Sequence, residues 1–145
     1  MKGLTDNGVN VESVEPINLS YSIDTTKGIL YHRREREITG THQSFFYSWI
    51  GGRFPPYEIL PLVNFARNAA TLTMKNLETA KPDTLDIYVS HEYWVAAFLY
   101  AWFGLEPINW VPFLDGFLFQ RLDDRMNVLY RDRSIEVHYP YWWQP

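Results

Sequence analysis

The residues best suited to chemistry in this chain lie between Asp86 and Glu92, in the order Asp-Ile-Tyr-Val-Ser-His-Glu. A histidine next to a carboxylate can transfer protons or bind an anion. His91 and Glu92 are therefore the candidate catalytic residues. The alternative for each is structural: His91 as a buried structural histidine, and Glu92 as an ordinary carboxylate that the dipole of a helix start favours.

The elements that must position these residues are a strand and a helix. The β-branched and aromatic run from Leu85 to Val89 predicts a buried strand. The stretch from Tyr93 to Phe103 is apolar all round, which predicts a buried helix that Gly104 closes. In α/β sheets ligands bind at the carboxyl ends of strands, and helix amino termini attract anions. The junction between the two elements is therefore the predicted site.

The rest of the chain predicts further helices, loops and strands. Leu62, Ala66, Ala69, Thr73 and Leu77 share one face at helical spacing. The predicted elements are a short strand over 19–24, a loop over 51–56, a helix over 61–77, a strand over 116–122, a turn over 123–125, its antiparallel partner over 126–131 and one more strand over 134–139.

Composition bounds the class of protein. The 145 residues predict a single domain over 1–145, and 46% hydrophobic against 21% charged residues argues against disorder. A net charge of −4 argues against nucleic-acid binding, and the absence of cysteine excludes disulfides and thiolate chemistry. No apolar run is long enough to span a membrane, and the first residues lack a signal-peptide pattern. We therefore expect a soluble cytoplasmic protein.

The other histidines are expected at the surface or in loops. None of His32, His42 and His138 follows a strand and precedes a glycine and a helix. The pairs His32 with Glu35 and His42 with Glu37 do not have the spacing of a metal site, so no metal is expected. The sequence also lacks a glycine-rich phosphate loop and a Gly-x-Ser-x-Gly turn. No cofactor is expected.

Three segments allow more than one interpretation. The mixed-sign run from Arg33 to Glu37 is typical of a solvated helix face, and the alternative is a binding site. The aromatic tail from His138 to Pro145 either packs back on its own domain or is covered by a partner subunit. Phe45, Phe46, Tyr47 and Trp49 either line the mouth of a pocket or pack beneath a loop.

Three segments resemble the C-terminal part of the histidine phosphatase superfamily, in its acid phosphatase and phytase branch. Ile87 to Glu92 is similar to the family's strand that ends in Ser-His-Asp. Trp110 to Gln120 is similar to the proline- and glycine-containing segment that opens the family's late hairpin, and Val128 to Arg133 is similar to its return strand. The resemblance covers roughly residues 57–137 and implies an α/β fold, a mixed sheet with flanking helices.

The resemblance also implies roles for individual residues. His91 and Glu92 would bind a phosphoryl group and donate a proton to the leaving group, with Ser90 as part of the anion-binding segment. Leu4 to Gly8 looks like the segment that follows the family's nucleophile. A further alignment of 21–27 puts Lys27 where the family has a phosphate-binding arginine, and a lysine cannot hold phosphate in a bidentate manner.

The main departure from the family is the absence of its nucleophile. The family carries that histidine in an Arg-His-Gly motif, and this chain has no Arg-His dipeptide. The alignment starts just after the motif, so the chain resembles a truncated domain without its first strand. Glu92 also replaces the family's aspartate. Without the nucleophile, a phosphoenzyme cannot form by the family route.

These observations predict a degenerate histidine-phosphatase-like protein with little or no phosphatase activity. It would retain a pocket for phosphate or a phosphomonoester at His91 and Glu92, with Lys27 as a further candidate. If the chain is active, it is a phosphomonoester hydrolase. The alternative is a non-catalytic interaction or scaffold module acting as a homodimer, since a lost strand leaves unpaired sheet edges. A third interpretation is a fragment of a longer enzyme.

Overall fold

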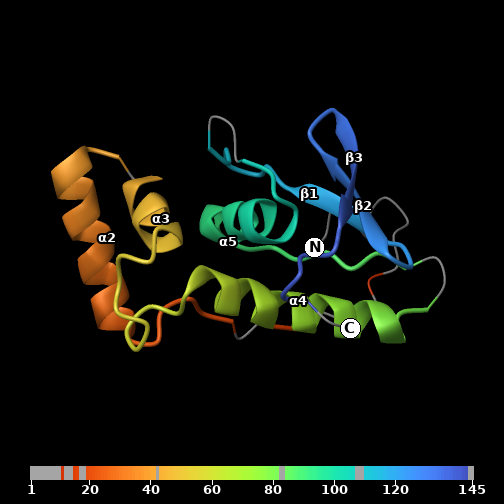
Figure 1. Cartoon of the computed structure of the whole chain (residues 1–145), viewed down its shortest axis with the longest axis horizontal. Coiled ribbons are helices and arrows are strands. Elements are labelled where there is room, and N and C mark those ends of the chain that lie inside the picture. The colour runs from red at the N-terminus through yellow and green to blue at the C-terminus, as the bar shows by residue number, and fades with distance from the viewer. Residues whose placement is uncertain are drawn as a thin grey trace.

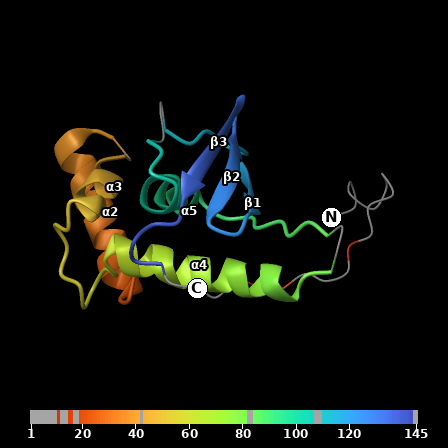
Figure 2. The same ribbon diagram turned by 45° about the vertical axis from the view of Figure 1, so that its right-hand side comes forward.

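The computed structural model describes residues 11, 15–16, 19–41, 43–81, 84–106 and 110–143. Helices form the first two thirds of this part and a sheet follows them (Figure 1). In both views α4 lies along one side of the molecule and the sheet along the other, with α5 between them and α2 and α3 at one end (Figures 1 and 2). The segment that resembles a sequence after a nucleophile, Leu4 to Gly8, lies outside the described residues.

The helices begin and end where local signals favour it. Helix α2 (Thr25–Thr39) starts at Asp24, whose carboxylate accepts a hydrogen bond from the Lys27 backbone N–H at 3.1 Å. It ends at Gly40, which has a φ of 74°. Helix α3 spans Gln43–Ile50 and α4 spans Leu62–Thr79, two residues beyond the predicted end. The predicted helix over 61–77 is therefore confirmed.

The predicted helix over 93–103 is also confirmed, in two parts. Helix α5 (Glu92–Ala97) continues as a π-helical turn, η1 (Phe98–Trp102). The Phe103 backbone N–H donates to the Phe98 carbonyl at 3.1 Å, and Gly104 follows with a φ of 66°. A π-turn of this kind is often found near functional sites.

Three antiparallel strands follow in the order β1 (Phe117–Arg121), β2 (Arg125–Tyr130) and β3 (Arg133–His138). The alternation in their sequences predicted all three, and tight turns set their registers, with Phe119 opposite Val128 and Val128 opposite Ile135. Met126, Val128 and Tyr130 face the core. The chain combines helices with a sheet as predicted, but the sheet is antiparallel throughout the described residues and not mixed.

The core is one cluster of buried side chains in which aromatic rings predominate. Phe45, Phe46 and Trp49 of α3 belong to it, so these residues pack inside the protein. The Trp49 indole N–H donates to the Leu60 carbonyl at 2.7 Å, which ties α3 to the chain that enters α4. The predicted loop over 51–56 is part of the segment that joins the end of α3 to the start of α4.

The largest correction concerns the predicted buried strand from Leu85 to Val89. Residues 84–90 have no regular secondary structure, and no backbone hydrogen bond within the described part of the chain joins them to a strand. Leu85, Ile87 and Val89 are 68%, 59% and 88% exposed. The β-branched pattern therefore produces an extended segment without a partner strand. The predicted strand over 19–24 is reduced to a single bridge between Ser22 and Ile59.

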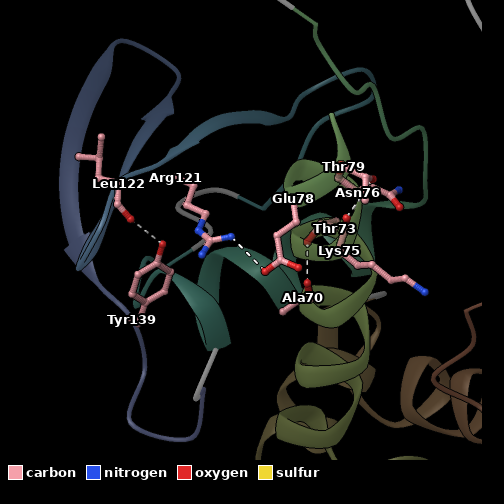
Figure 3. Close-up of polar contacts among 9 residues, drawn as sticks. All are labelled: Ala70, Thr73, Lys75, Asn76, Glu78, Thr79, Arg121, Leu122 and Tyr139. Carbon is pink, nitrogen blue, oxygen red and sulfur yellow. Dashed lines mark hydrogen bonds and ion pairs between the residues drawn. The ribbon is translucent and has the colours of Figure 1, made fainter. Parts of the chain in front are cut away.

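The aromatic tail packs on its own domain. The rings of Trp142 and Trp143 each lie 5.1 Å from the ring of Trp102, and Arg67 lies over Trp142 at 5.9 Å. Tyr139 donates a hydrogen bond to the Leu122 carbonyl at 3.0 Å (Figure 3). These contacts agree with the interpretation in which the tail packs back on its own domain.

Candidate functional site

Ser90, His91 and Glu92 lie where the unpaired segment meets α5. His91 precedes the first helical residue with extended backbone angles, and its carbonyl accepts from the Trp94 N–H at 2.9 Å. Ser90 and His91 are exposed and Glu92 is half-buried. The three residues are adjacent at an accessible position, although the segment before them is not the buried strand that the sequence predicted.

These residues open onto a large cavity of about 1520 Å³. One wall is formed by every residue from Thr84 to Glu92, and another by every residue from Trp110 to Asp123. Residues of α4 and α5 complete it. An exposed imidazole here can bind or protonate a small ligand. Among the described residues, Arg121 is the only Lys or Arg that lines the cavity, and its guanidinium is 3.2 Å from Glu78 (Figure 3).

The loop before β1 is held in an unfavourable backbone conformation. Trp110 and Leu114 have φ values of 66° and 64°, which side chains of this size rarely adopt. Arg131 fixes the loop, because its guanidinium donates to the Trp110 carbonyl at 3.0 Å and to the Asp115 carboxylate at 3.1 Å. Such strain persists where surrounding contacts impose it, and it concentrates at functional positions.

A polar cluster that the sequence did not predict includes Tyr93, the residue directly after Glu92. The His32 ring stacks on Phe45 with centroids 3.8 Å apart. Its Nε2 lies 3.0 Å from the Tyr21 hydroxyl and its Nδ1 lies 3.5 Å from the Tyr93 hydroxyl. The prediction that His32 is a surface or loop histidine is therefore wrong. Its partners lie 11 and 61 residues away, so no local pattern could have indicated them.

The phenols of this cluster are held in their neutral form. Burial raises the pKa of Tyr93, and the nearby negative charge of Glu92 raises it further. The same two causes, in the same order, raise the pKa of Tyr21. Glu92 is thus electrostatically coupled to two phenols that bond to His32, which links the candidate site to the protein interior.

This coupling predicts a loss of stability in alkaline solution. A tyrosine whose pKa is raised by folding stabilises the protein below the unfolded value of about 10, and that contribution is lost as the pH rises through the folded value. We expect the free energy of unfolding to fall between about pH 8 and about pH 11, and to fall less in Tyr93→Phe. Urea unfolding at both pH values measures it. The exposed Tyr141→Phe variant is the control, and an equal pH dependence in both variants would contradict the prediction.

The predicted anion-binding residue Lys27 lies elsewhere. Its ammonium group is 3.6 Å from the Glu58 carboxylate, and it does not line the cavity of His91. The structure therefore brings Ser90, His91 and Glu92 together without Lys27. Lys27 lies in the first turn of α2.

The remaining predictions on site residues have different outcomes. His138 is exposed on β3, as predicted, and His42 lies outside the described residues. Within the part of the chain that the structure describes, no three His, Cys, Asp or Glu side chains are grouped to hold a metal ion. In the run from Arg33 to Glu37, four side chains are exposed as expected, but Glu35 is buried and accepts a hydrogen bond from the Ser48 hydroxyl at 2.9 Å.

Comparison with protein-family models, with curated proteins and with solved structures gave no match to this chain. Among the described residues, none of the helices combines the length and the apolar character that crossing a membrane requires.

Proposed function

We propose that this protein is a degenerate histidine-phosphatase-like domain that binds phosphate or a phosphomonoester weakly and hydrolyses it slowly or not at all. The observation that carries the proposal is the Ser-His-acid segment 90–92, which opens onto a large cavity with an exposed imidazole. His91 is the anion-binding residue and Ser90 its hydroxyl neighbour. Glu92 is the residue that would correspond to a proton donor.

The same residues account for weak binding. Tight phosphate sites combine several cations or bidentate arginines, whereas Arg121 is engaged by Glu78 and Lys27 by Glu58. The carboxylate of Glu92 next to His91 also opposes an anion. A site with one neutral or singly charged imidazole is expected to bind phosphate only at high concentration.

Hydrolysis of p-nitrophenyl phosphate tests the lack of activity. We expect release of p-nitrophenol at the rate of buffer alone, because no Arg-His-Gly nucleophile is present in the sequence. His91→Ala should leave that rate unchanged, as should His138→Ala, a matched exposed histidine outside the cavity. Hydrolysis above the buffer rate that disappears only in His91→Ala would refute the proposal of an inactive domain.

A homodimeric scaffold was the alternative to this function. Trp142 and Trp143 of the aromatic tail pack on Trp102 of the same chain, whereas Tyr141 between Pro140 and Trp142 is exposed. Among the described residues β1 pairs only with β2, so its other edge can accept an added strand.

A further inference from the structure

The cavity beside His91 is larger than a site for a small molecule. Its volume of about 1520 Å³ exceeds the roughly 300–1,000 Å³ of most ligand pockets. Its long walls consist of two continuous stretches of chain, 84–92 and 110–123. This shape suits an elongated occupant. The inference from it does not depend on the proposed phosphate site, which lies at the 90–92 end of one wall.

Helix α4 forms the floor of the cavity. Ala69, Thr73 and Leu77 all line it, and their spacing of four places them along one face of the helix. Ala69 and Thr73 are buried and Leu77 is half-buried. Leu72, also half-buried, lines the cavity beside this row, so the floor is mostly apolar.

The two walls are attached to opposite sides of this floor. Asn76 donates a hydrogen bond to the Tyr88 hydroxyl at 2.9 Å, and Glu78 binds Arg121 of β1 at 3.2 Å. Asn76 and Glu78 precede and follow Leu77, and successive helical residues are about 100° apart around the axis. The segment that contains Tyr88 and the strand β1 thus flank Leu77. Figure 3 shows Arg121 reaching Glu78, with Asn76 on the same helical turn.

Both walls carry backbone groups for which the described residues provide no partner strand. Within the described residues β1 pairs only with β2, and 84–90 pairs with no strand. Leu85, Ile87 and Val89 alternate, so that they share one side of the extended segment, and all are exposed. Leu118 of β1 is 55% exposed as well. An unpaired edge with exposed apolar side chains is a template for an added strand.

A strand added between 84–90 and β1 must form backbone hydrogen bonds along both of its edges, so neither edge can already be paired in a sheet. In a second copy of this chain, β1 has only one free edge because β2 occupies the other. The extended segment 84–92 of a second copy carries Asp86 and Glu92, and their charges would repel the same carboxylates in the cavity. The occupant that fits is therefore an extended segment that belongs to no sheet. We propose that the cavity accepts an extended segment of another polypeptide as an added strand, apolar at alternate positions and basic at its ends.

The charges of the walls specify the basic ends. Asp86, Glu92 and Asp123 line the cavity and form no ion pair among the described residues. The cavity's guanidinium, on Arg121, is already paired with Glu78. The free charges of the cavity are thus negative, and complementary lysines or arginines would favour the correct partner.

The test uses the whole chain and a blocked synthetic peptide, Lys-Val-Thr-Val-Thr-Val-Lys. We expect saturable NMR shifts in 84–92 and 117–121, with slower hydrogen exchange of the backbone amides in both stretches. A peptide with proline at the central valine should not bind, because proline removes a donor and disrupts strand pairing. A peptide with glutamates in place of the lysines should bind more weakly.

Charge reversal in the protein tests the role of the acidic residues, and a second reversal outside the cavity is its matched control. Asp86→Lys should weaken binding of the lysine-ended peptide by at least about fivefold and favour the glutamate-ended one. Asp132→Lys, an exposed residue that does not line the cavity, should change neither. Equal binding of the proline peptide would overturn strand addition. Protection of 84–90 and 117–121 by self-association, without peptide binding, would overturn the choice of partner in favour of a second copy.

The peptide experiment is separable from the phosphate proposal. Peptide shifts along 84–89 and 117–121 in a protein that ignores phosphate would support the groove and reject the anion site. Phosphate shifts limited to 90–92 with no peptide binding would do the reverse.

Discussion

Replacing Trp102 by alanine is expected to lower the free energy of unfolding by about 4 kcal/mol, a large part of the roughly 5–15 kcal/mol that stabilises an ordinary domain. The Trp102 side chain is 2% exposed, and its indole N–H donates to the Met126 sulfur at 2.8 Å. Its ring also contacts Trp142 and Trp143. The substitution therefore removes the contact that joins η1, β2 and the tail.

Urea unfolding followed by circular dichroism measures this effect. Tyr141→Ala is the control, since Tyr141 belongs to the same tail and is 92% exposed. We expect the control to change the free energy of unfolding by less than about 0.5 kcal/mol. A loss below about 1 kcal/mol for Trp102→Ala would mean that the tail does not pack on η1.

Replacing Ser48 by alanine is expected to cost about 2 kcal/mol, because it leaves the buried carboxylate of Glu35 without its partner. The Ser48 hydroxyl donates to that carboxylate at 2.9 Å, and both residues are buried between α2 and α3. An unpaired buried acceptor costs more than the hydrogen bond itself contributes.

The measurement for this pair is a double-mutant cycle in urea. Glu35→Met with Ser48→Ala removes both polar groups, and the double variant should be more stable than Ser48→Ala alone. Additive losses from the two single changes would show that the pair is not coupled. Ser20→Ala, an exposed serine that bonds only within its own turn, is the matched control.

The sequence predicted those elements whose patterns depend on burial of one face. The helix over 61–77 follows from the spacing of Leu62, Ala69 and Leu77, and the strands from the alternation around Val128. The same reasoning failed for 85–89, where β-branched residues are extended but exposed. Periodicity shows that a segment favours an extended backbone, but not that a neighbouring strand exists to pair with it.

The candidate site was predictable in the same partial way. Adjacency in the sequence was enough to put Ser90, His91 and Glu92 together, and the helix that follows them was visible as an apolar run. The cluster of His32 with Tyr21 and Tyr93 depends on contacts between three elements, which no local pattern encodes. Lys27 was assigned through an alignment, and its ion pair with Glu58 is a tertiary contact of the same kind.

The measurement that tests the central claim most directly is an NMR titration of the protein with inorganic phosphate. We predict saturable shifts confined to Ser90, His91 and Glu92, lost in His91→Ala and retained in His138→Ala. A response at His138 equal to that at His91, or no response at residues 90–92 at any phosphate concentration, would contradict the claim that this segment binds phosphate.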